Sequence, residues 1–121
     1  MPHVGITTII KSKISDLVDF LPSTIAGYGF FAKEVLEENT FIHVTHVHRD
    51  LVDRKDCENT WINLEPNYLY NHSKKHENCE SVTDGLTKGL STIKLIPKGQ
   101  ELLVDYTKDK ELEQPQSGWV E

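Results

Sequence analysis

The amino-acid sequence predicts a single, mainly β domain with little helix. Short β-branched and aromatic segments recur along the chain, turn-forming residues separate them, and no stretch has the apolar period of a long amphipathic helix. The 121 residues are enough to bury one hydrophobic core but not two. We therefore expect one domain over residues 1–121, with a core over about 4–107 and a tail over 108–121.

The first half of the chain is expected to alternate strands with turns. Residues 4–10, 17–21 and 41–48 are short and rich in β-branched or aromatic residues, which is typical of strands. Residues 37–39 form a turn in this interpretation, since Asn tolerates the left-handed backbone region. Residues 49–66 are polar and irregular, and we expect a loop there with one short helical turn.

The second half has a clearer strand-turn-strand pattern near its end. Residues 92–96 and 102–106 are expected to be strands, joined by a tight turn at 97–100 in which Gly99 takes positive φ. The charged residues that follow predict a loosely ordered tail, apart from Trp119.

Charge and cysteine content exclude several classes of function. The formal net charge is -6, with 19 acidic against 13 basic residues, which argues against non-specific nucleic-acid binding and favours a basic protein or peptide as partner. Cys57 and Cys79 are too few for a disulfide scaffold or a four-thiolate zinc site. No signal-peptide pattern and no apolar run near the roughly 20 residues of a membrane span are found. We expect an intracellular protein, cytoplasmic or nuclear in a host cell, with reduced thiols.

Three short polar motifs follow or flank apolar segments: Gly27-Tyr28-Gly29, Asn71-His72-Ser73 and Asp105-Tyr106. Each has an ordinary interpretation on its own. These are a glycine-permitted strand bend, an exposed turn, and a half-buried tyrosine with its hydroxyl in water. None of the three is specific when taken alone, and only their order along the chain indicates a function.

In that order the motifs resemble the SET-domain family of protein lysine methyltransferases. GYGFFA is followed after about forty residues by NHS with a nearby Asn-Cys pair, and after about thirty more by GQELLVDY. The family carries a G-x-G motif, an N-H-S-C-x-P-N-like segment and a G-E-E-L-x-x-x-Y strand. The resemblance spans about Ile25 to Tyr106, and the length is similar to that of short stand-alone viral and bacterial members.

The resemblance implies a SET-type fold of small curved sheets around a pseudoknot-like core. In that core, residues 67–79 would pass beneath the loop that ends near Tyr106. It also implies methyl transfer from S-adenosylmethionine to a lysine side chain of a protein substrate. Lys74 stands where the family has cysteine, and Gln100 where a glutamate is common, which bears on substrate choice and methylation number more than on the cofactor site.

The resemblance assigns roles to individual residues. Tyr106 matches the catalytic tyrosine and would also line the substrate channel, where Tyr70 either joins it or packs in the core. A tyrosine with a pKa of about 10 is mostly neutral at pH 7, so Tyr106 would position the amine rather than remove its proton. Trp119 would cover the channel or cap a hydrophobic edge. The residues assigned to the cofactor are Gly27, Tyr28, Gly29, Asn71, His72 and Trp119.

The sequence leaves two other functions open. The first is a small metal-binding β-barrel, in which His43, His46 and His48 hold a divalent metal with His72 or His76. No carboxylate follows His48 at the spacing of the cupin family, and a plainer interpretation is a set of surface histidines on an exposed strand. The second is a SET fold that binds a lysine peptide without turnover. A homodimer is also left open.

Overall fold

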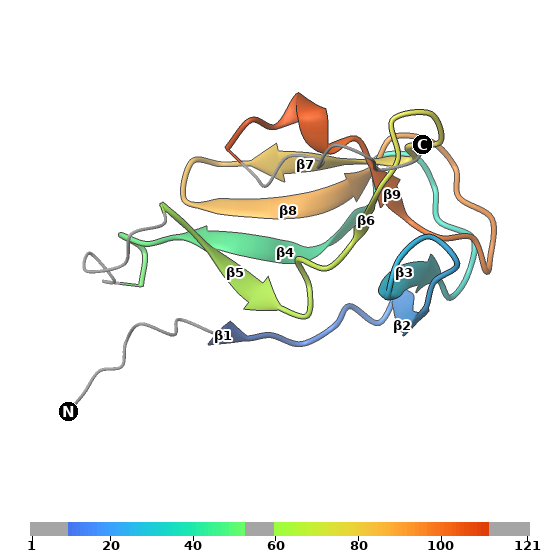
Figure 1. Cartoon of the computed structure of the whole chain (residues 1–121), viewed down its shortest axis with the longest axis horizontal. Helices are drawn as coiled ribbons and strands as arrows, with labels where there is room; N and C mark the ends of the chain where they lie inside the picture. The colour runs from blue at the N-terminus through green and yellow to red at the C-terminus, as the bar shows by residue number, and fades with distance from the viewer. Residues whose placement is uncertain (1–9, 53–59, 112–121) are drawn as a thin grey trace.

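The structure is a computed structural model that describes residues 10–52 and 60–111. Within them, a seven-stranded sheet has the order β1-β5-β4-β8-β7-β9-β6, and β2 and β3 form a separate two-stranded sheet (Figure 1). The strands are β1 (Ile10–Lys11), β2 (Val18–Pro22), β3 (Tyr28–Ala32), β4 (Phe41–His48), β5 (Trp61–Glu65), β6 (Asn71–His72), β7 (Cys79–Thr83), β8 (Thr87–Thr92) and β9 (Leu103–Val104). A 3-10 helix, η2 (Tyr106–Lys108), follows β9.

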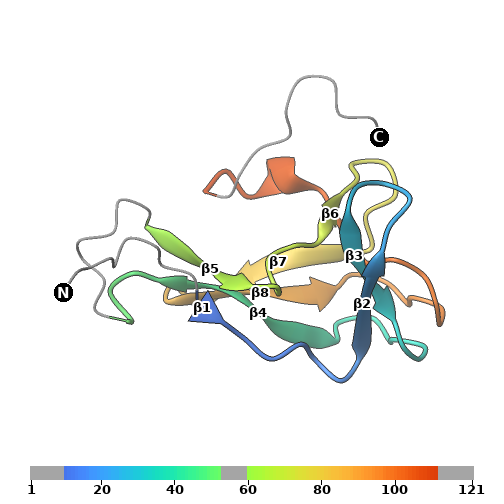
Figure 2. The same cartoon turned by 60° about the horizontal axis from the view of Figure 1, so that its bottom comes forward.

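The antiparallel centre of the large sheet is built by β4, β5, β7 and β8. The β4 strand pairs with β5 on one side and β8 on the other, and β8 also pairs with β7. Its pairing with β8 shifts register between Phe41 and His43 and again between Val44 and His46. Such bulges increase the local twist and bend the strand, which curls the sheet. The small sheet of β2 and β3 lies at the end of the large sheet where β6 and β9 are found (Figures 1 and 2).

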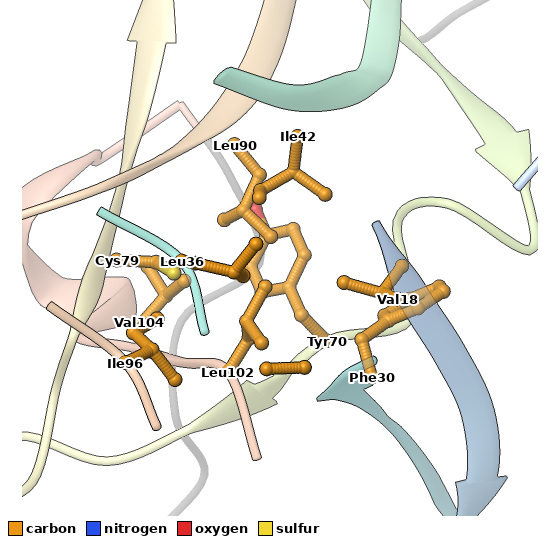
Figure 3. Close-up of a cluster of buried hydrophobic side chains, with 11 residues drawn as sticks. Val18, Phe30, Leu36, Ile42, Tyr70, Cys79, Leu90, Ile96, Leu102 and Val104 are labelled. Atoms are coloured by element: carbon orange, nitrogen blue, oxygen red, sulfur yellow. The ribbon is translucent and has the colours of Figure 1, made fainter. Parts of the chain in front are cut away.

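The hydrophobic core lies at that same end, between the two sheets. Phe30 accepts a main-chain hydrogen bond from Leu102 at 2.8 Å, so the small sheet is joined to the chain just before β9. Side chains from both sheets interlock there (Figure 3). The buried cluster is Val18, Phe30, Ala32, Leu36, Ile42, Tyr70, Cys79, Leu90, Ile96, Leu102 and Val104. Each large apolar side chain contributes about 1.5–3 kcal/mol by leaving water, so the core fixes this end of the molecule firmly.

Strand β9 lies between β6 and β7 and is parallel to both. The chain therefore crosses β9 between residues 73 and 78, on its way from one neighbour to the other. Asn78 secures the crossing, since its Oδ1 accepts from Leu103 N at 2.8 Å and its Nδ2 donates to Glu101 O at 2.9 Å. A crossover this short is unusual for parallel strands. The predicted mainly β fold class is confirmed, and the crossing gives the core the threaded form that was expected.

Several predicted elements agree with the structure. The strand predicted at 41–48 matches β4, and β2 begins one residue later than predicted. Asn39 has φ 64° and Gly99 has φ 85°, as the two predicted turns require. The strand predicted at 4–10 lies mostly outside the described residues, and only Ile10 of it is seen, in β1.

Four predictions about secondary structure are wrong. The loop predicted at 49–66 contains strand β5, whose buried Ile62 and Leu64 alternate with exposed or half-buried neighbours. Strand β8 ends at Thr92, the residue at which a strand over 92–96 was expected to begin. Strand β9 is shorter than the predicted 102–106, because Asp105 leaves the strand to cap η2. A loosely ordered tail was predicted after Tyr106, but residues 107–111 of it are held by η2 and by ion pairs to Lys88, while residues 112–121 lie outside the described residues.

Candidate functional site

Two of the three motifs predicted from sequence are in direct contact. Asn71, the first residue of β6, turns its amide toward the loop that enters β3. Its Nδ2 donates to the carbonyl oxygens of Ala26 and Tyr28, at 3.2 Å each, and to Glu101 Oε2 at 2.7 Å. Asn71 therefore joins the Gly27–Gly29 segment to the chain that leads into β9.

The two glycines of the G-x-G motif serve different purposes. Gly27 has φ 44° and closes a turn in which its carbonyl accepts from Ser23 N at 2.8 Å. Gly29 is buried, and a Cβ there would lie 2.0 Å from Glu101 Oε2. Only glycine lets that carboxylate come so close to the strand. Tyr28, between them, is 54% exposed and stacks on Phe20 with ring centroids 5.2 Å apart.

Glu101 is a site residue that sequence reasoning missed. Its carboxylate accepts from Ser23 Oγ at 2.8 Å and from Asn71 Nδ2 at 2.7 Å, so it joins the β2–β3 turn to β6. The signal in the sequence is a single carboxylate directly before the apolar run Leu102–Val104. A charged residue entering a buried strand needs partners, and here those partners are the motifs themselves.

The Asp105-Tyr106 motif is held in place by the Asn71-His72-Ser73 motif. His72 is buried, and its Nδ1 accepts a hydrogen bond from the main-chain nitrogen of Tyr106 at 3.0 Å. This bond assigns the proton of a neutral imidazole to Nε2. The ring centroids of His72 and Tyr106 are 5.1 Å apart. His72 thus fixes the point at which the chain turns from β9 into η2.

Tyr70 and Tyr106 form an edge-to-face pair with ring centroids 5.7 Å apart. The Tyr106 hydroxyl donates to the main-chain carbonyl of Tyr70. Burial, with smaller contributions from Tyr106 and Asp109, raises the pKa of Tyr70 far above its ordinary value, so this residue stays neutral. Its ring belongs to the hydrophobic core, which was one of its two predicted roles.

Asp105 and Lys108 fix the two ends of η2. Asp105 accepts from Thr107 N at 3.0 Å and from Thr107 Oγ1 at 2.6 Å. Burial works to raise the pKa of Asp105, but these hydrogen bonds outweigh it and leave the pKa below its usual value. Lys108 forms an ion pair with Glu77 in the crossing segment. Trp119, the remaining predicted site residue, lies outside the described residues.

Two of the three histidines of β4 are buried, and His48 is partly exposed. His43 is 7% exposed and His46 is 5% exposed, which corrects the interpretation of an exposed strand. His43 packs on Phe30, and His46 bonds Thr45 Oγ1 at 2.7 Å. Burial lowers the pKa of each to about 4. In residues 10–52 and 60–111, no group of three or more His, Cys, Asp or Glu side chains is placed to hold a metal ion.

Comparisons with known proteins identify the fold. No family model matches the sequence, and no curated protein sequence matches it significantly. Solved structures do match. A candidate histone methyltransferase of Plasmodium falciparum is 20% identical, with a TM-score of 0.56 over 90% of this chain and 100% of that one. The ctPRC2 complex bound to trimethylated and lysine-to-methionine forms of histone H3 gives 20% identity and a TM-score of 0.58 over 76% of this chain.

A second ctPRC2 structure, without ligand and with two substitutions in Ezh2, gives 21% identity and the same TM-score of 0.58. The chain covers only 14% and 15% of the two ctPRC2 chains. At these identities the likeness shows a shared fold, which is the SET type predicted from the sequence motifs. Within the described part of the chain, no helix is long and apolar enough to cross a membrane.

Proposed function

We propose that this protein transfers a methyl group from S-adenosylmethionine to the side-chain amine of a lysine in a protein substrate. One observation carries the proposal. The crossing at β9 brings Gly29, Asn71, His72 and Tyr106 to one end of the fold, linked by hydrogen bonds and one close packing contact. The fold, shared with a structure described as a histone methyltransferase, supports the same function.

The residues present fit the charge of this cofactor. When bound, S-adenosylmethionine supplies a methyl group on a positively charged sulfonium, and it also carries an ammonium. Hydrogen-bond acceptors surround Asn71, namely the carbonyls of Ala26 and Tyr28 and the Glu101 carboxylate. At Gly27 a Cβ would meet nothing within 4 Å, so the main chain there is open to a ligand. We assign Gly27, Tyr28, Gly29, Asn71 and His72 to the cofactor, with Trp119 covering it.

Tyr106 would orient the lysine amine. Its hydroxyl donates to the carbonyl of Tyr70, and the oxygen of a hydroxyl can also accept an N–H of an amine. This points the nitrogen lone pair away from the tyrosine. A protonated lysine has no lone pair to attack with, and the ordinary pKa of a lysine amine is about 10.4, so the channel must favour the neutral amine by excluding water. Tyr106 acts in this scheme by position and not as a base.

The substrate we propose is a lysine in a basic protein segment. A net charge of -6 raises the encounter rate with cationic partners. We group the protein with SET enzymes of viral or bacterial type and expect it to act inside a cell. Whether it works as a homodimer is a separate question for measurement in solution.

Calorimetric titration of S-adenosylmethionine tests the cofactor site. We expect micromolar binding to the wild type and binding at least about tenfold weaker for His72→Ala, because that change removes the acceptor for Tyr106 N–H. The matched control is His76→Ala, since this exposed histidine belongs to the same crossing segment. No binding at millimolar cofactor would refute the proposal. Cofactor binding without transfer to any lysine of a basic protein panel would reduce it to a binding module.

A further inference from the structure

Lys88 is a buried cation outside the site described above. It lies in β8, with a side chain that is 1% exposed. Its Nζ donates to Asp109 Oδ2 at 2.6 Å and to Glu111 Oε1 at 2.9 Å, and lies 4.6 Å from the ring centroid of Trp61. Three distant parts of the chain meet at this ammonium: β5, β8 and the segment that follows η2.

Burying an ammonium is costly unless it is paired and hydrogen-bonded. Here two carboxylates and an aromatic face surround it. Burial works to lower the pKa of Lys88, but the hydrogen bonds to Asp109 and Glu111 outweigh burial and raise the pKa. Replacing such a buried pair by apolar groups is often neutral for stability. Stability alone therefore does not account for this arrangement.

Asp109 connects Lys88 to Tyr106. Its carboxylate accepts hydrogen bonds from Lys88 Nζ and, at 3.3 Å, from Ser81 Oγ. Its main-chain nitrogen donates to Tyr106 O at 3.3 Å. The main-chain nitrogen of Tyr106 in turn donates to His72 Nδ1. The main chain of Tyr106 is thus fixed from two directions, by the crossing segment and by the centre of the large sheet.

We propose that Lys88 is a positioning residue for Tyr106, acting through Asp109. Through this ammonium, together with Ser81 Oγ of β7, the large sheet sets where η2 ends and so where the Tyr106 hydroxyl lies. This inference rests on the proposed methyl transfer for its catalytic consequence, but its structural part stands without it. The two parts are separated by measuring hydrogen exchange and turnover on the same variants.

The test uses Lys88→Met, which keeps the length of the side chain and removes its charge, and Asp109→Asn, which keeps the size and weakens the pair. The control is Lys33→Met, since Lys33 pairs with Asp19 on the surface at 3.7 Å. We expect amide exchange at Tyr106 and Asp109 to speed up at least about tenfold, with exchange at Leu90 unchanged. We expect kcat to fall about tenfold while KM for S-adenosylmethionine changes less than about twofold.

The outcomes distinguish the positioning of Tyr106 by Lys88 from its consequence for catalysis. Unchanged exchange at Tyr106 and Asp109 in both variants would overturn the positioning role, as would an equal increase at Leu90, which would show a purely structural pair. Normal kcat in both variants with an active wild type would overturn the catalytic consequence. An inactive wild type would refute the proposed function, while the exchange data would still decide whether Lys88 positions Tyr106.

Discussion

The imidazole Nδ1 of His72 accepts the main-chain hydrogen of Tyr106 at 3.0 Å. This bond joins two motifs that are 34 residues apart in the sequence. It makes His72 a support for the main chain of the proposed catalytic residue, in addition to any contact with the cofactor. Loss of the ring is therefore expected to disturb both cofactor binding and the start of η2.

Replacing Tyr106 by Phe removes the hydroxyl and keeps the ring against Tyr70 and His72. We expect kcat for methyl transfer to fall about 100-fold, because the amine loses its orienting acceptor, while cofactor Kd stays within about twofold. Steady-state kinetics and calorimetry on the same preparation measure both. Tyr68→Phe is the matched control, and turnover that is equal for the two variants would refute the role of Tyr106.

Gly29→Ala is expected to destabilise the protein by about 2 kcal/mol through overpacking. The new Cβ would lie 2.0 Å from Glu101 Oε2, and the carboxylate would have to leave Asn71. Chemical denaturation of Gly29→Ala, Glu101→Ala and the double variant measures this. The cost of the Gly29 change should nearly vanish when Glu101 is already Ala. Additive costs would show that the two side chains do not compete for space.

Asn78→Ala tests the crossing over β9. The change removes the hydrogen-bond partners that Leu103 N–H and the Glu101 carbonyl have now. Because both groups are at least partly buried, it should lower the free energy of unfolding by about 3 kcal/mol. Asn78→Asp keeps the acceptor for Leu103 but loses the donor, so an intermediate cost is expected. Asn63→Ala on the exposed side of β5 is the control. Thermal and urea unfolding would show the ranking, and a neutral Asn78→Ala would contradict it.

The protein is expected to lose stability in mild acid. Burial lowers the pKa values of His43 and His46 to about 4 in the folded state, whereas an unfolded histidine keeps its ordinary pKa of 6.5. Between those pH values the unfolded chain binds more protons, so the free energy of unfolding falls as pH drops from about 6.5 toward 4. The full effect is roughly 3 kcal/mol for each histidine. Urea unfolding at pH 7 and pH 4.5 measures it, and His43→Gln should lessen the difference. The same stability at both pH values would contradict the burial of these rings.

The sequence motifs were sufficient to predict the fold and the segments that meet at the candidate site. Each of the three motifs is common by itself, but the G-x-G motif, the Asn-His pair and the tyrosine rarely follow one another in that order. Their order therefore predicted the fold, which no single motif could do. The structure brings Asn71 to Gly27–Gly29 and His72 to Tyr106. Their contacts with a cofactor stay predictions, as does the place of Trp119.

The missed features depend on partners that are distant in sequence. Glu101 looks like an ordinary charge until Ser23 and Asn71 are brought beside it. Strand β5 is hidden because its exposed face carries Asn63 and a polar stretch precedes it, although Ile62 and Leu64 alternate correctly. Strand β8 was not among the predicted elements, and at its Gly89 a Cβ would meet the Phe41 ring at 2.4 Å. Periodicity cannot show such close approaches between strands.

The place of β9 between β6 and β7 also sets the order in which the molecule can assemble. The antiparallel strands β4, β5, β7 and β8 precede β9 in the chain and can pair without it. Residues 101–106 then have to enter between two segments that are already linked by residues 73–78, a late and non-local step that costs loop-closure entropy. During synthesis from the N-terminus, the sheet is expected to exist before the site does. Activity would therefore appear only when β9 has been inserted.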